Sequence, residues 1–164
     1  MNRARTFRAL RAALALGVVG WIAAAPTAAD NADTRTTIRL LAIHATNEDE
    51  PHIDPELEPL KAALERFGYN SFRLKVNRRR RVEEGKSWEH PLMEDYAIRM
   101  EPRDVSEKRV TLHIMWLRYE KGEKGERVAR VLSDQVVTLA KGRYAIMGGW
   151  RLSEGAIVGI LGVR

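Results

Sequence analysis

The 164-residue sequence contains no cysteine, which excludes disulfides, catalytic thiols, thiolate metal ligands and lipid anchors on cysteine. A domain without disulfides must be held together by a packed core. Roughly 130 residues are enough to bury close to two-thirds of the surface that the unfolded chain exposes. One domain with one main core is therefore expected.

Acidic residues are missing from the first 29 positions, where four arginines give a positive start. An apolar tract, residues 12–25, follows, and the small residues Thr27 and Ala29 suit cleavage after Ala29. This three-part layout predicts a secretory signal peptide at 1–29. The tract is shorter than the about 20 residues that a membrane-spanning helix needs. After cleavage, the mature protein is not expected to be an integral membrane protein.

The net charge of the mature chain, after removal of the signal peptide, is small. The chain has 28 Lys and Arg against 22 Asp and Glu, and loss of the four signal arginines leaves 24 against 22. The basic isoelectric point therefore reflects the export signal. We expect a periplasmic or secreted protein, for which no nucleic-acid partner is expected.

Short segments with strand-like patterning, separated by turn residues, fill most of the mature chain. The segment TTIRLLAIHA (36–45) predicts a strand that is covered on both faces, and RVTLHIMWLRYE (109–120) predicts the clearest strand. Pro91 predicts that SWEHPLM is an edge strand or a bulged one. A break is expected near Ser133 and Asp134. Such strand spacing is typical of a meander or sandwich.

One helical pattern stands out, DPELEPLKAALERFGY, with Asp54 as its expected N-cap and Gly68 as its stop. Its apolar stripe comprises Leu57, Leu60, Leu64 and Phe67. A single helix argues against a parallel sheet with many crossovers. The predicted fold class is α+β, an antiparallel β-sheet or small β-sandwich with one amphipathic helix packed on it.

The expected division of the chain follows from these patterns. Residues 1–29 are the signal peptide, 30–35 a disordered start of the mature chain, and 36–164 a single β-rich domain.

The run Arg78, Arg79, Arg80 and Arg81 is the most concentrated charge in the sequence. It lacks the interleaved aromatics of a nucleic-acid surface, and Glu83 and Glu84 follow it after Val82. One interpretation is a solvated strand edge whose charges prevent aggregation. The other is a contact for an anionic envelope partner, such as an anionic surface polymer or glycan.

Catalytic patterns are missing as well. The sequence has no Gly-x-Ser-x-Gly elbow, no phosphate-binding glycine loop and no standard zinc spacing, so we expect neither a cofactor nor a metal site. His113 is expected to be a packed strand residue. An alternative left open is a small exported hydrolase or metal-binding enzyme that uses the loop from His44 to Asp54. No catalytic residue is assigned, and the sequence leans against an enzyme.

The C-terminal segment VVTLAKGRYAIMGGWRLSEGAIVGILGVR reads as three strands with a Gly148-Gly149 pair. This segment resembles hairpins of the outer-membrane secretins. The order of strand, DPEL helix, FGYNSFRL and hairpins ending in GG resembles an uncharacterised group of small bacterial proteins with signal peptides. Neither resemblance implies an activity or a functional residue.

Gly148 and Gly149 permit a bulge or the close approach of a second backbone, including a partner strand. With the arginine run, they are the residues we expect to contact a partner. The favoured function is a non-enzymatic β-rich module that contacts another cell-envelope or secretion component.

Overall fold

A computed structural model describes residues 34–164, which lie within one compact unit, residues 32–164. The predicted signal peptide lies outside the described residues, as do positions 30–33. The first strand begins at Arg35, inside the segment expected to be disordered. The described elements are β1 (Arg35–Thr46), β2 (His52–Ile53), η1 (Pro55–Leu60), α1 (Lys61–Leu64), η2 (Glu65–Phe67), β3 (Ser71–Glu83), β4 (Trp88–Pro91), β5 (Tyr96–Val105), β6 (Arg109–Lys121), β7 (Arg127–Ala140), β8 (Tyr144–Arg151) and β9 (Ala156–Val163).

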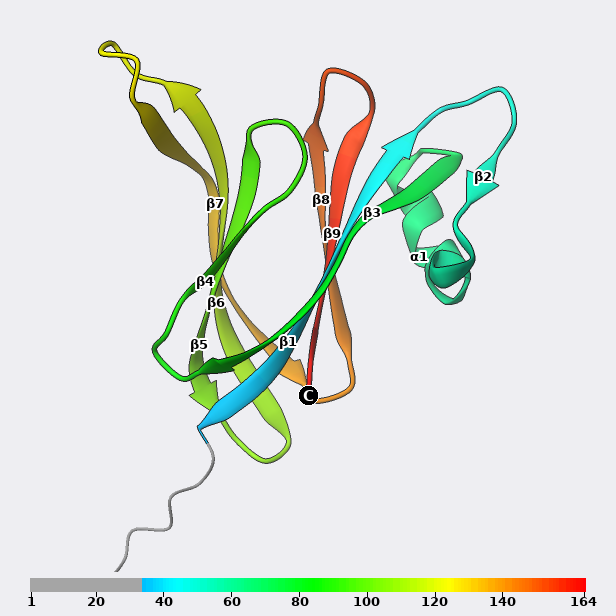
Figure 1. Ribbon diagram of the computed structural model, residues 1–164. Helices are drawn as coiled ribbons and strands as arrows, with labels where there is room; N and C mark the ends of the chain where they lie inside the picture. Colours follow the sequence, from blue (N-terminus) through cyan, green and yellow to red (C-terminus); the bar gives the residue numbers. More distant parts are fainter. Residues whose placement is uncertain (1–33) are drawn as a thin grey trace, which may run out of the picture. The chain divides into compact units, whose positions relative to one another are not determined.

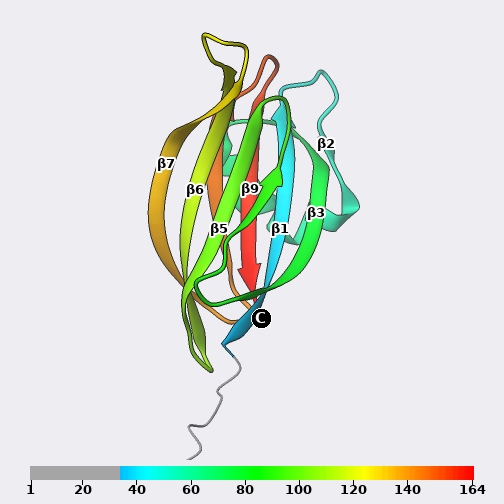
Figure 2. The same ribbon diagram turned by 60° about the vertical axis from the view of Figure 1, so that its left-hand side comes forward.

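The strands form two sheets, as Figures 1 and 2 show. Sheet A has the order β2-β3-β1-β9-β8, and sheet B has the order β4-β5-β6-β7. All pairings are antiparallel except the short pairing of β2 with β3. The predicted β-rich α+β class is confirmed. Pro91 lies in an edge strand, β4, as its missing backbone donor requires.

Two clusters of buried side chains hold these elements. The larger cluster combines alternate residues of both sheets, among them Ile38, Ile114, Trp116 and Leu161. The smaller lies on the other face of sheet A, under the helical segment. Strand β1 therefore has apolar residues on both faces, which is the pattern that the sequence predicted for 36–45.

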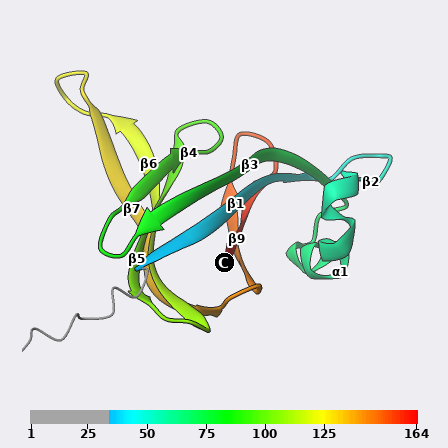
Figure 3. The same cartoon turned by 60° about the horizontal axis from the view of Figure 1, so that its bottom comes forward.

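The predicted helix is present but is not a continuous α-helix. The helical segment, which Figure 3 shows near β2, has only one α turn, α1, between the 3₁₀ segments η1 and η2. Pro59 lies inside η1, where its ring and missing N–H disfavour α-helical hydrogen bonding. The expected stripe nevertheless packs on sheet A, with Leu57 and Leu64 fully buried.

The expected break in β7 is a bulge. Trp116 pairs with Ser133 and Leu117 pairs with Val131, so Leu132 is the additional residue. The bulge divides β7 into a basic first segment and a second segment, Ser133–Ala140.

Candidate functional site

The four predicted arginines lie in the second half of β3 and are all exposed. From Arg73 onward, no described strand pairs with the outer side of β3, because β2 reaches only Ser71 and Phe72. The run is therefore a charged sheet edge, a position in which charge opposes pairing with other chains.

The arginine run does not act as one patch, because side chains of a strand alternate between faces. Val76 and Val82 contact the main core, so Arg78 and Arg80 share their face of sheet A. Arg79 lies on the opposite face, the one on which the helical segment packs. There it joins arginines that are distant in sequence.

A hollow on that opposite face is lined by Arg39, Arg79, Arg143 and Tyr144, among others. Arg39 comes from the central strand β1, where it is the register partner of Arg79. Arg143 comes from the turn before β8. The sequence showed only Arg79, because the other two enter through strand pairing that no local pattern reveals.

Gly148 and Gly149 form a bulge in β8, the other edge strand of sheet A. Their φ angles are 144° and 93°, both in the region that favours glycine. A Cβ on Gly148 would lie 2.6 Å from the carbonyl oxygen of Ile157, whereas one on Gly149 would meet nothing within 4 Å. The pair therefore permits a close approach within the sheet, which supports its structural use.

This bulge also decides which way Trp150 points. Ala145 and Met147 face the main core, so strict alternation would turn Trp150 to the opposite face of sheet A. The extra residue shifts the alternation by one, and Trp150 stacks on Trp116 with ring centroids 3.8 Å apart. The glycine pair is thus part of the core's construction.

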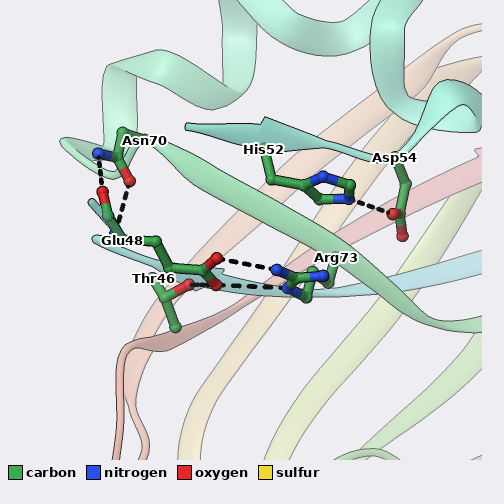
Figure 4. Close-up of polar contacts among 6 residues, drawn as sticks. All are labelled: Thr46, Glu48, His52, Asp54, Asn70 and Arg73. Atoms are coloured by element: carbon green, nitrogen blue, oxygen red, sulfur yellow. Dashed lines mark hydrogen bonds and ion pairs between the residues drawn. The ribbon is translucent and has the colours of Figure 1, made fainter. Parts of the chain in front are cut away.

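The loop between β1 and the helical segment was the alternative enzymatic site, and Figure 4 shows its polar contacts. Arg73 binds the Glu48 carboxylate through Nε at 3.3 Å and a terminal nitrogen at 2.8 Å. Asn70 accepts a hydrogen bond from the Glu48 backbone N–H and donates one to its carbonyl oxygen. These contacts fasten the loop to β3.

Asp54, at the end of this loop, is also held by hydrogen bonds. One oxygen of Asp54 lies 2.9 Å from Nε2 of His52, and the other accepts a bond from the backbone N–H of Leu74 at 2.6 Å. Asp54 occupies the N-cap position of η1, as predicted, but its side chain makes no capping hydrogen bond. The carboxylate accepts its backbone hydrogen bond from β3 instead. His44 points elsewhere, to the carbonyl oxygen of Glu154.

Within residues 34–164, no group of three or more histidine or acidic side chains is arranged to hold a metal ion. The hydrogen bonds from Arg73 and then Thr46 lower the pKa of Glu48 from 4.5 to about 2. The pKa of Asp54 is lowered chiefly by its hydrogen bond to His52, then by the Leu74 N–H. Both loop acids are thus stabilised as structural carboxylates.

The Glu48 contacts predict an acid-sensitive loop. A carboxylate whose folded pKa is depressed stabilises the fold above its unfolded pKa, and that contribution is lost as the pH falls towards the folded value. The window for Glu48 therefore extends from about pH 5 down to about 2. We expect Glu48→Gln to lose less unfolding free energy than the wild type when denaturation is measured at pH 6 and again at pH 2.5. Equal losses would contradict the assignment.

His113 lies on the outer face of sheet B and is 13% exposed. Its Nδ1 lies 2.9 Å from a guanidinium nitrogen of Arg103, and its Nε2 lies 2.6 Å from Asp134. Because arginine only donates, Nδ1 accepts and Nε2 donates to the carboxylate. The predicted packed, satisfied histidine is confirmed, and neither ring nitrogen is available as a base.

The edge of sheet B differs from the charged edge of sheet A. No described strand pairs with the outer side of β7. Its second segment, Ser133–Ala140, has one charged residue, Asp134, and no proline or glycine. The exposed large apolar side chains of residues 34–164 all lie on β7 and β8: Val128, Val131, Val136 and Tyr144. The low charge of SDQVVTLA is visible in the sequence, but no sequence motif marks this strand as a free edge.

Comparison with known proteins adds no relative. No protein-family model matches the chain, and neither does a curated protein or a solved structure. Among the described residues, no helix has both the length and the apolar character needed to cross a membrane. The function must be inferred from the geometry above.

Proposed function

We propose that the protein is an exported, non-enzymatic β-module that binds an extended segment of another cell-envelope or secretion component. The partner segment adds to the free edge of β7 at Ser133–Ala140. In this proposal the two sheets are the layers of a small β-sandwich, since their facing side chains share the main core. Export follows from the signal peptide expected at 1–29.

The observation that carries the proposal is the contrast between β7 and the other edges. Natural sheets protect edges with charge, proline, short strands and bulges. The arginine run protects β3, Pro91 and four-residue length protect β4, and the Gly148-Gly149 bulge distorts β8. Ser133–Ala140 has only one charged residue, Asp134, and no proline, and its one bulge lies before it.

Exposed side chains on this segment indicate what the partner presents. Val136 is 64% exposed, so an apolar side chain of an added strand would gain buried surface against it. An acid opposite Asp134 would be repelled. The expected partner is therefore an extended segment with alternating apolar residues and no acid at that position. Main-chain hydrogen bonds to the free edge would supply most of the affinity.

The non-enzymatic part of the proposal is supported by the state of the polar groups. His113, Glu48 and Asp54 each use their side-chain atoms in bonds that join elements of the fold. Groups committed in this way hold strands and loops together.

Val136→Lys tests this function. Lysine on an edge strand opposes pairing, so we expect the amount of partner recovered after crosslinking of intact cells to fall at least about tenfold. Val128→Lys is the matched control, because Val128 is also exposed on β7 but precedes the bulge. The control should keep its partner.

Equal recovery from the wild type and Val136→Lys would contradict the proposal, as would equal loss from both variants. Recovery of a second copy of the chain alone would show that the edge serves self-association instead.

A further inference from the structure

The basic hollow on sheet A has a volume of about 270 Å³. It lies on the face that carries the helical segment, but beyond that segment, near the end of β9 marked in Figure 1. Arg39 precedes Leu41 by two positions, and Gly162 follows Ile160 by two. Leu41 and Ile160 pack under the helical segment. Arg39 and Gly162 lie on the same face of sheet A, in the part that the helical segment does not cover.

The charged side chains among the residues that line the hollow are all basic. Arg39, Arg79, Arg143 and Arg164 line it, and no aspartate or glutamate does. Among the described residues, neither Arg79 nor Arg143 forms an ion pair with an acid. Arg39 donates from Nε to Asn77 at 3.4 Å, a neutral partner.

The strand register places two of these arginines opposite each other, which destabilises the sheet when no anion is bound. Arg39 and Arg79 are direct cross-strand partners, and like charges in that position destabilise a sheet. Edge protection explains Arg79, because β3 is an edge. It does not explain Arg39, which lies in the central strand β1, or Arg143, which lies in a turn.

Guanidinium groups match oxyanions in shape as well as charge. Each can give two parallel hydrogen bonds to a phosphate or carboxylate, and arginine is preferred where such bonds are needed. Three guanidinium groups around one small hollow suit a dianion better than a single carboxylate.

The wall of the hollow is shaped by a tyrosine. A Cβ on Gly162 would lie 2.7 Å from the Tyr144 ring, so the absence of a side chain there lets the ring lie against β9. Tyr144 and Thr37 add hydroxyl groups to the lining, which can donate to an oxyanion. The volume is that of a small group rather than a polymer chain.

From these features we propose that the hollow is a binding site for a phosphate monoester group, held by Arg39, Arg79 and Arg143. The group can belong to a soluble ester or to a lipid headgroup, and the chemistry of recognition is the same. The site is separate from the β7 edge, so it does not depend on the function proposed above.

Calorimetric titration with glycerol 3-phosphate, and sedimentation with vesicles containing phosphatidate, test the site. Phosphatidylcholine vesicles are the blank. The double variant Arg39→Gln/Arg79→Gln should lose at least about tenfold in affinity, because each charge-assisted pair contributes strongly. Arg143→Gln, at an exposed turn, should lose affinity independently.

The matched control is Arg78→Gln/Arg80→Gln, which removes the same number of positive charges from the other face of sheet A. This control should bind like the wild type. Without ligand, Arg39→Gln/Arg79→Gln should unfold at the same temperature as the wild type or higher, since a repulsion is relieved.

Binding of glycerol 3-phosphate with this variant pattern supports a soluble ligand, and binding of phosphatidate vesicles alone with the same pattern supports a lipid headgroup. Binding of neither probe overturns the proposal. Equal weakening by the two double variants also overturns it, because that result means nonspecific attraction.

Discussion

Replacement of Trp116 by alanine is expected to lower the free energy of unfolding by about 3–5 kcal/mol. Trp116 is fully buried in the core shared by the two sheets. Its ring stacks on Trp150 at 3.8 Å with an interplanar angle of 22°. Deletion of the ring removes buried apolar contact and leaves a cavity between β6 and β8. Equilibrium denaturation, followed by circular dichroism, measures the loss.

Trp116→Phe is the control for this prediction. Among the described residues, the indole N–H of Trp116 has no hydrogen-bond partner, so phenylalanine removes an unpaired donor while it keeps an aromatic ring. We expect a cost of about 1–2 kcal/mol. If Trp116→Ala were as stable as Trp116→Phe, the two sheets would not share the core described here.

A second large effect is expected at the β8 bulge. Gly148→Ala should destabilise the protein by about 2–4 kcal/mol, since the new methyl group would overlap the Ile157 carbonyl and the backbone φ is unfavourable for alanine. Gly149→Ala changes the neighbouring residue, also at positive φ, but its methyl group meets open space. That variant should lose only about 1–2 kcal/mol. The difference between the two losses in stability measures the effect of the close approach between Gly148 and the backbone of β9.

The two alanine variants also test the orientation of Trp150. If the bulge turns Trp150 into the core, Gly148→Ala should also shift the tryptophan emission to longer wavelength in the folded state, because the stack on Trp116 would be disturbed. Equal destabilisation by the two alanine variants would contradict this role.

Strand content could be predicted from the sequence, because alternation in segments such as 109–120 reflects burial on one face. The orientation of Trp150 could not. It depends on one extra residue, Gly149, in β8, and this bulge is defined by the register of β8 against β9. The helical segment was located correctly, but Pro59 and the short length of α1 changed its geometry.

The candidate sites also contain residues that the sequence could predict and residues that it could not. Position 79 was visible as part of a basic run, whereas Arg39 and Arg143 join it only through the pairing of distant strands. Asp54 occupies the N-cap position that its neighbours predicted, yet its carboxylate accepts a hydrogen bond from the backbone N–H of Leu74 instead of a helix N–H. Such competition is decided by tertiary structure.

We propose that an extended partner segment adds to β7 at Ser133–Ala140. The most direct measurement places a photo-crosslinking side chain at position 136 in the chain expressed in its own cells, with position 80 on β3 as the comparison. We predict one adduct with another envelope protein from position 136 and none from position 80. Adducts from both positions, from neither, or with a second copy of this chain only would contradict the claim.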